Sequence, residues 1–179
     1  NMIVDNLREG VVIESASPAV RDNVIARNQG IGIRVQTSNV VITGNKILDN
    51  SPLDMQADMS GEPVQALENW WGTVSGINIL ARIKGKINIA TILDGDKPAG
   101  KPMKLPILES ELGGTIDKDS FLILSNSPYR IAKDVVVTNG ATLYIEPGVS
   151  LLYDQGRAIT VEDGGVMAFR TVTADKLYG

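Results

Sequence analysis

The sequence predicts an all-β solenoid with about 22–24 residues in each coil. Three observations predict this fold. Residues 1–60 repeat with a period of 22, residues 135–169 repeat with an offset of 24, and apolar residues within each copy alternate at strand spacing. Because one copy is too short to bury its own apolar face, the copies are expected to stack and to bury one continuous apolar column.

The first repeat is visible as columns of equivalent residues. Ile3, Ile25 and Ile47 align at the period of 22. Three further apolar columns follow the same period: Val11 with Ile33 and Met55, Ile13 with Val35 and Ala57, and Val20 with Ile42 and Val64. Short β-branched runs such as 11–13 and 33–35 predict two or three short strands in each copy, joined by bends.

Asparagine fills two more columns: Asn1, Asn23 and Asn45, and Asn6, Asn28 and Asn50. We expect the second column to stack directly. Asparagine accepts left-handed backbone geometry at bends, and its amide can bond the amides above and below it. A structural role is favoured over a catalytic one, because an amide is a poor acid or base.

Residues 23–33 and 39–50 resemble the right-handed parallel β-helix repeat of the pectate-lyase-like superfamily. The resemblance implies a parallel β-helix of the secreted or cell-surface bacterial type, and therefore an extracellular or cell-surface location. The same coil is shared by lyases, hydrolases, epimerases, phage adhesins and proteins with no activity. The likeness thus implies a fold and no particular reaction.

The repeat fails after residue 60, where the chain changes character. The adjacent tryptophans of 69–72 are expected to cap the coils or pack beneath the next segment, with a sugar-stacking platform as the alternative. Residues 74–84 could form a short amphipathic helix, and 86–93 read as a strand. Residues 94–106 have the Pro, Gly and charge content of a loop or linker, and their Asp-Gly-Asp is better explained as a solvated turn than as a calcium loop.

The second repeat begins after this linker. Residues 135–145 align with 159–169, and residues 149–153 form a third strand between them. The Asn-Gly and Asp-Gly pairs in the two copies would ordinarily favour hairpins, but the recurrence at 24 favours coils. Residues 107–127 are expected to hold one or two bridging strands.

The predicted domain organisation therefore has three parts. They are parallel β-helix coils over 1–72, a capping segment and linker over 73–127, and the start of a second β-helix module over 128–179.

Composition excludes several chemistries. The chain has no Cys and no His, which removes disulfides, thiolate nucleophiles, imidazole bases and His- or Cys-ligated metals. A net charge of −4 gives no electrostatic case for nucleic acid, and no apolar run is long enough for membrane insertion. We expect no cofactor and no metal. Because Asn1 already lies in register with the repeat, we also expect the chain to be a piece of a longer protein.

Three exposed columns hold the candidate ligand-binding residues. Asp5, Arg27 and Asp49 alternate in sign, which fits either a surface charge ladder or a site in which Arg27 binds an acidic sugar. In a neighbouring region, Arg34 is expected near Glu14 and Asp58. No catalytic residue is carried over from the superfamily, because its compact cluster of calcium-binding carboxylates has no counterpart here.

Two functional hypotheses follow. The leading one is a non-catalytic structural or adhesive, binding solenoid fragment of a secreted or cell-surface bacterial protein. The alternative is a fragment of a carbohydrate-active enzyme, either a polysaccharide lyase, an epimerase or a hydrolase. The expected partner is a polysaccharide or another copy of the chain.

Overall fold

The computed structural model describes residues 1–37 and 39–169. In this part of the chain one short α-helix and one 3-10 turn interrupt an otherwise all-β architecture, in which strands stack in parallel as a solenoid of about eight coils. The predicted all-β solenoid is thus confirmed. The chain divides into two compact units, Asn1–Leu105 and Pro106–Gly179.

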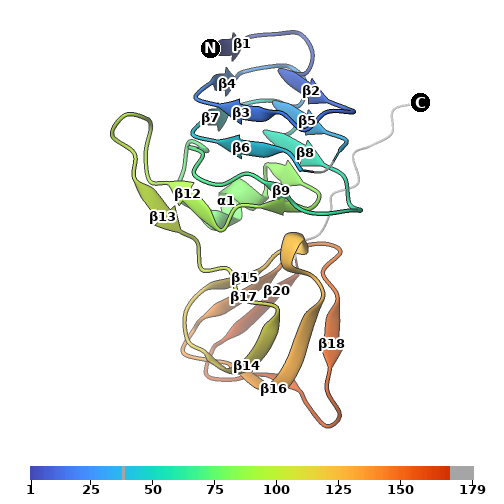
Figure 1. Ribbon diagram of the computed structural model, residues 1–179. Coiled ribbons are helices and arrows are strands. Elements are labelled where there is room, and N and C mark those ends of the chain that lie inside the picture. Colours follow the sequence, from blue (N-terminus) through green and yellow to red (C-terminus); the bar gives the residue numbers. More distant parts are fainter. Residues whose placement is uncertain (38, 170–179) are drawn as a thin grey trace, which may run out of the picture. The chain divides into compact units, whose positions relative to one another are not determined.

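The first unit contains three parallel sheets, in each of which neighbouring strands come from successive coils (Figure 1). The first sheet contains β1 (Met2–Val4), β4 (Val24–Ala26) and β7 (Lys46–Leu48). The second contains β2 (Val11–Ile13), β5 (Ile33–Val35), β8 (Met55–Ala57) and β10 (Ile83–Lys84). The third contains β3 (Ala19–Arg21), β6 (Val41–Thr43), β9 (Val64–Gln65) and β11 (Ile87–Asn88).

The predicted columns are the strand registers of these sheets. Ile3 pairs with Ile25, and Ile25 pairs with Ile47. The columns that begin at Val11 and Ile13 are also in register through β2, β5 and β8. Ile25 and Ile47 are fully buried, and each such side chain contributes about 1.5–3 kcal/mol of hydrophobic free energy. The stacked apolar columns are therefore the core of the unit.

The period of 22 first changes after β8. Val41 pairs with Gln65 and Lys46 bridges to Trp70, which are offsets of 24 instead of 22. Two additional residues therefore lie in the turn between β8 and Gln65. The expectation that Val64 would continue the column of Val20 and Ile42 is consequently wrong.

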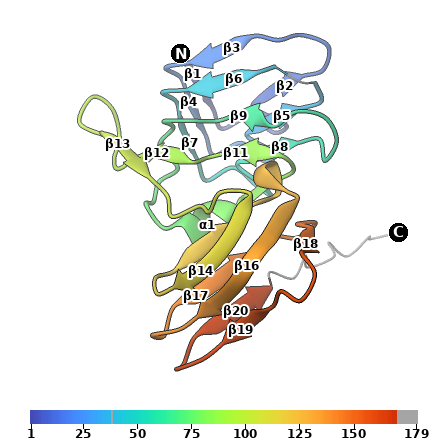
Figure 2. The ribbon, with the colours of Figure 1, turned by 60° about the horizontal axis from the view of Figure 1, so that its bottom comes forward.

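The coils continue beyond the tryptophans. Helix α1 (Gly76–Leu80) buries Ile79 and Leu80, and β10 and β11 then add to the second and third sheets. The segment expected as a loop begins with the tip of an antiparallel hairpin, which joins β12 (Thr91–Leu93) to β13 (Pro102–Lys104) (Figure 2). Residues 102–104 are thus a strand, paired with residues that precede the tip.

The second unit has two parallel sheets. One contains β14 (Glu111–Ile116), β16 (Tyr129–Val137), β18 (Leu151–Tyr153) and β19 (Ile159–Val161). The other contains β15 (Ser120–Leu122), β17 (Thr142–Ile145) and β20 (Val166–Phe169), and the 3-10 turn η1 spans Leu124–Asn126. Val135 pairs with Ile159 and Leu143 with Met167, so the predicted offset of 24 is confirmed.

The Asn-Gly and Asp-Gly bends of this unit join strands of one coil and do not form hairpins. Both residues of each bend have left-handed backbone, with φ of 55° at Asn139 and 71° at Gly140. Nevertheless β17 pairs in parallel with β15 and β20, one coil below and one above. Tyr129 is fully buried at the centre, where its hydroxyl accepts from the Ile123 N–H at 2.9 Å and donates to the Ile123 carbonyl at 3.2 Å.

Candidate functional site

Asparagine ladders connect successive coils of the first unit. Asn6 Nδ2 donates to Asn28 Oδ1 at 2.7 Å, and Asn28 Nδ2 donates to Asn50 Oδ1 at 2.7 Å. Each acceptor oxygen also receives the backbone N–H of the asparagine that precedes it in the ladder. The predicted stack of Asn6, Asn28 and Asn50 is confirmed. Because Asn28 and Asn50 are buried, these bonds satisfy polar groups that water does not reach.

The second asparagine column forms a ladder of the same kind. Asn1, Asn23 and Asn45 are joined by side-chain hydrogen bonds of 3.1 Å. Asn45 Nδ2 then donates to Asn69 Oδ1 at 3.0 Å, so the ladder crosses the two-residue change in period. Residue Asn69 therefore takes the place that strict periodicity gives to Leu67.

Every ladder asparagine after Asn1 follows a residue with left-handed backbone. In the first ladder these residues are Asp5, Arg27 and Asp49, with φ between 54° and 58°. In the second ladder they are Asp22, Gly44 and Glu68, with φ of 55°, 68° and 55°. The left-handed geometry expected at asparagine thus falls one residue earlier, on residues that are exposed except for the buried Gly44.

Asp54 ends the first ladder. Its Oδ1 accepts from the backbone N–H of Asn50 at 2.9 Å and from Asn50 Nδ2 at 3.0 Å, as an asparagine oxygen does elsewhere in the ladder. The carboxylate is only 3% exposed, and Arg82 Nε donates to its other oxygen at 2.8 Å. Arg82 Nη2 also donates to the backbone carbonyl of Asn50. A buried carboxylate is retained here because this guanidinium neutralises it.

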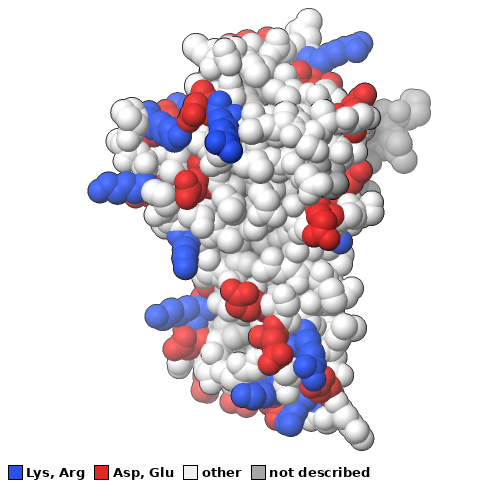
Figure 3. Space-filling model, viewed as in Figure 1, with Lys and Arg blue, Asp and Glu red and all other residues white. Residues whose placement is uncertain are grey.

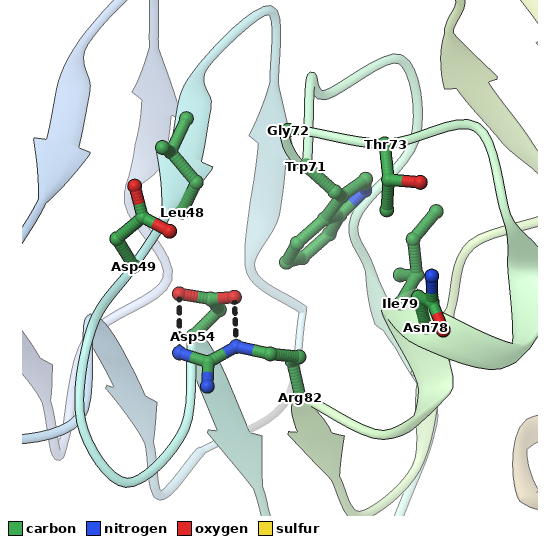
Figure 4. Close-up of a pocket in the computed structure, with 9 residues that line it drawn as sticks. All are labelled: Leu48, Asp49, Asp54, Trp71, Gly72, Thr73, Asn78, Ile79 and Arg82. Atoms are coloured by element: carbon green, nitrogen blue, oxygen red, sulfur yellow. Dashed lines mark hydrogen bonds and ion pairs between the residues drawn. The ribbon is translucent and has the colours of Figure 1, made fainter.

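A pocket of about 290 Å³ lies beside this ion pair (Figure 4). We call it the Arg82 pocket, and its lining residues are Leu48, Asp49, Asp54, Trp71, Gly72, Thr73, Asn78, Ile79 and Arg82. Figure 4 shows Asp49 on one side of the pocket and Thr73 and Asn78 on the other. The bend after β7 supplies Asp49, whereas α1 supplies Asn78, so two separate segments place polar groups at one cavity.

The two tryptophans face different environments. Trp71 is only 4% exposed and forms a wall of the Arg82 pocket, and its indole Nε1 is buried without a hydrogen-bond partner. Trp70 is half-buried and bridges to Lys46. Burial of Trp71 fits the packing role expected from sequence and leaves little of its ring available for a ligand to stack on.

Asp5 and Arg27 form a surface ion pair. Arg27 Nε and Nη2 donate to the two carboxylate oxygens of Asp5, both at 2.8 Å. The hydrogen bond from Arg27 lowers the pKa of Asp5, and that same bond raises the pKa of Arg27. Arg27 is thus held by its neighbour in the charge ladder.

Asp49, the third member of that ladder, takes part in no ion pair among residues 1–37 and 39–169. Its charge acts at longer range on both Arg27 and Arg82, where it contributes to the raised pKa of each guanidinium. Of the five candidate residues predicted from sequence, Asp49 is the one that lines the Arg82 pocket.

Arg34 has a different partner from the expected pair of Glu14 and Asp58. It forms an ion pair with Glu9, and both side chains are about one-third exposed or less. The backbone and the Arg34 hydrogen bond together lower the pKa of Glu9. Of the five candidates, Asp5, Arg27, Arg34, Asp49 and Asp58, the structure thus pairs Arg27 with Asp5 and places Asp49 at the Arg82 pocket, while Arg34 pairs with a residue outside the set.

The surface charges are interspersed and not segregated. On the face shown in Figure 3, acidic and basic side chains lie next to one another. In the part of the chain that the structure describes, no three acidic side chains are grouped closely enough to hold a metal ion. None of the described helices has the length and apolar character that crossing a bilayer requires.

Sequence reasoning did not identify Asp54 or Arg82. Asp54 follows Asn50 by only four residues in the same coil, so it does not stand at the 22-residue spacing of the asparagine ladder that it ends. Arg82 lies 28 residues further on, after a helix that has no counterpart in the earlier coils. No periodic signal could have connected these residues.

Comparison with known proteins adds no family. No protein-family model, no curated protein and no solved structure matches this chain.

Proposed function

We propose that this chain is a non-catalytic β-solenoid, which serves as a structural and adhesive part of a secreted or cell-surface protein. We further propose that the Arg82 pocket is its binding site and that the ligand is a neutral sugar residue of a glycan. The observation that carries this proposal is the difference between the two carboxylates of the pocket. Asp54 is occupied by Asn50 and Arg82, whereas Asp49 is open to a ligand.

A single open carboxylate suits binding better than hydrolysis. Glycoside hydrolysis ordinarily needs two carboxyl groups that flank the scissile bond and act as acid and as base or nucleophile. Asp54 already accepts two hydrogen bonds from Asn50 and an ion pair from Arg82. It is thereby fixed as the end of the ladder, and among the described residues that line the pocket no other carboxylate is left to act together with Asp49.

The arginines of this region are also poor bases. The hydrogen bond from Asp54 raises the pKa of Arg82, and the hydrogen bond from Asp5 raises the pKa of Arg27. Both guanidiniums therefore stay protonated at any physiological pH. A lyase mechanism that removes a proton through arginine would need the opposite shift.

The pocket has the size and polarity for one small, hydroxyl-rich group. Its volume of about 290 Å³ lies just below the range for small-molecule sites, about 300–1,000 Å³. The Asp49 carboxylate accepts hydrogen bonds, Asn78 and Thr73 both donate and accept, and sugar hydroxyls can match each of them. A uronate is disfavoured, because its carboxylate would meet Asp49 while the charge of Arg82 is engaged by Asp54.

The proposal is tested by screening the purified chain on a glycan array and measuring the affinity of any hit by calorimetry. Asp49→Asn keeps the left-handed backbone, since asparagine tolerates it, and removes the charge. We expect Asp49→Asn and Asn78→Ala to weaken binding of a neutral glycan at least ~10-fold. Asp58→Asn, an exposed carboxylate outside the pocket, should leave the affinity unchanged.

Two results would contradict the proposal. If no glycan binds the wild-type chain, or if Asp49→Asn and Asp58→Asn behave alike, the pocket is not a glycan site. If the chain cleaves a polysaccharide and Asp49→Asn abolishes that cleavage, the enzyme hypothesis replaces the adhesive one.

A further inference from the structure

The tip of the β12–β13 hairpin is tied to the coils of the first unit by two ion pairs. Asp96 Oδ2 lies 2.5 Å from Lys46 Nζ, and Lys97 Nζ lies 2.6 Å from Asp22 Oδ1. The two pairs have opposite polarity, because the tip supplies an anion to one and a cation to the other. The partners come from two successive coils, since Lys46 follows Asp22 by about one period of the repeat.

Buried residues hold the base of this hairpin in place, whereas the residues at its tip are exposed. Ile92 and Leu93 in β12 are buried, whereas residues 96–99 are all exposed. Hydrogen bonds within the tip join the Asp94 N–H to the Lys101 carbonyl and the Gly100 N–H to the Asp96 carbonyl. The tip is therefore an ordered unit, and the charged side chains of Asp96 and Lys97 connect it to the coils.

A second cavity, of about 200 Å³, lies where the tip meets the coils. We call it the Trp70 pocket, and it is lined by Asp22, Asn23, Val24, Gly44, Asn45, Lys46, Trp70, Leu93, Asp96 and Lys97. The coil surface is shaped to admit the tip lysine. A Cβ atom on Gly44 would lie 2.3 Å from Lys97 Nζ, so that a side chain at this position would displace the lysine.

We propose that the hairpin tip is a salt-sensitive flap, which the Asp96–Lys46 and Lys97–Asp22 pairs latch over the Trp70 pocket. Exposed ion pairs stabilise weakly and are screened by dissolved salt, so the closed state should lose population as ionic strength rises. The hydrogen bond from Lys97 lowers the pKa of Asp22, which is consistent with an ionised latch at neutral pH. Opening of the flap would uncover Trp70 while the buried base of the hairpin stays in place. This inference does not depend on the Arg82 pocket.

The chain has no cysteine, so two introduced cysteines can report the position of the flap. Ala99→Cys labels the exposed tip and Arg21→Cys labels the exposed coil surface beside Asp22. Spin labels on both sites give a distance distribution by pulsed electron resonance. We expect one short distance at low salt and a growing longer component towards 1 M salt, where the screening length is only about 3 Å.

Charge variants in the labelled background test the latch itself. Asp22→Lys should produce the long component already at low salt, and the swap of Asp22→Lys with Lys97→Asp should restore the short distance. Asp5→Lys, which breaks the Asp5–Arg27 surface pair far from the flap in sequence, is the matched control and should change nothing.

Two outcomes would overturn the proposal. A single short distance at every salt concentration and in Asp22→Lys would make the hairpin a fixed clasp. A long distance at every salt concentration would mean that the latched state is not populated. Circular dichroism of each variant verifies that the coils remain folded, so that a change in distance reports the flap and not unfolding.

Discussion

Asp54 Oδ1 accepts the backbone N–H and the side-chain amide of Asn50, and so takes the position of one more asparagine in the ladder. A carboxylate can accept hydrogen bonds but cannot pass one on. The ladder therefore stops at Asp54, and Arg82 balances the charge that remains there. The same ion pair closes the first ladder and forms a wall of the Arg82 pocket.

Substitution of Asp54 should separate its two roles. In Asp54→Asn an acceptor remains for Asn50 but Arg82 loses its carboxylate, and we expect a loss of about 1–3 kcal/mol in the free energy of unfolding. Asp54→Ala also leaves the Asn50 donors unpaired and should be more destabilising. Urea denaturation followed by tryptophan fluorescence measures this, because both tryptophans lie in the first unit. Equal stability of Asp54→Ala and wild type would contradict the assigned role.

A carboxylate in the buried interior of the first asparagine ladder should destabilise the fold. Asn28 Nδ2 donates to Asn50 Oδ1 and to the Ile3 carbonyl, and aspartate at position 28 would place a buried negative charge against both acceptors. We expect Asn28→Asp to cost about 3–5 kcal/mol at pH 7, as an uncompensated buried charge does. Asn1→Asp, at the exposed end of the other ladder, is the control and should cost little. Comparable losses for the two variants, measured in urea, would count against the ladder as a buried network.

The coils approach so closely at Gly32 that no side chain fits. A Cβ atom there would lie 2.5 Å from the Asp54 carbonyl oxygen and 2.6 Å from Asn50 Nδ2. Gly32→Ala must therefore push two coils apart, and we expect thermal unfolding of the first unit at a clearly lower temperature. Gly61→Ala is the comparison, since a Cβ at that position has nothing within 4 Å and meets only the strain of a left-handed φ of 82°. A Tm lowered more by Gly61→Ala than by Gly32→Ala would show that close coil packing is not limiting.

Tyr129 should make the second unit sensitive to alkali. Burial raises the pKa of Tyr129 to about 12, from an ordinary value near 10. The folded state therefore holds its proton where the unfolded state has lost it. This contribution to stability is complete below about pH 10 and declines as the pH rises through 12.

Two measurements check this behaviour. Titration of phenolate absorbance should contain a component that ionises near pH 12, and Tyr129→Phe should remove that component. Because that variant leaves the Ile123 N–H and carbonyl without the hydroxyl, it should also destabilise the fold by about 1–3 kcal/mol at neutral pH. If every tyrosine titrates near pH 10, the hydroxyl is not buried as described.

The repeat could be predicted from the sequence because, in stacked coils, residues that are one period apart in the sequence lie opposite one another in neighbouring strands. Ile3, Ile25 and Ile47 are in contact positions for the same reason that they align, and the Asn6 column follows the same rule. The offset of 24 in the second unit could also be predicted from the sequence, although its Asn-Gly and Asp-Gly pairs favour hairpins when considered alone. Parallel pairing with the neighbouring coils outweighs the preference of the Asn-Gly and Asp-Gly bends for hairpins.

What the sequence could not supply are features that interrupt the period. The change of offset before Gln65 misplaced Val64, and the partner of Arg34 proved to be Glu9 from the bend before β2. The Arg82 pocket exists because α1 inserts an aperiodic segment whose following residue reaches back to Asp54. The side chains that end a repeat are positioned by tertiary contacts. Such contacts cannot be inferred from the spacing of residues along the chain.

The left-handed residue before each ladder asparagine has a wider consequence. Aspartate, arginine, glycine and glutamate all occupy this place, and the bend keeps its shape with each of them because the adjoining amides hold the turn together. The exposed side chains at these corners can therefore differ without any change in the interior of the coils. Evolution or protein design can therefore replace a column of these corner residues, one from each coil, so that the surface recognises a new ligand while the buried coils keep their structure.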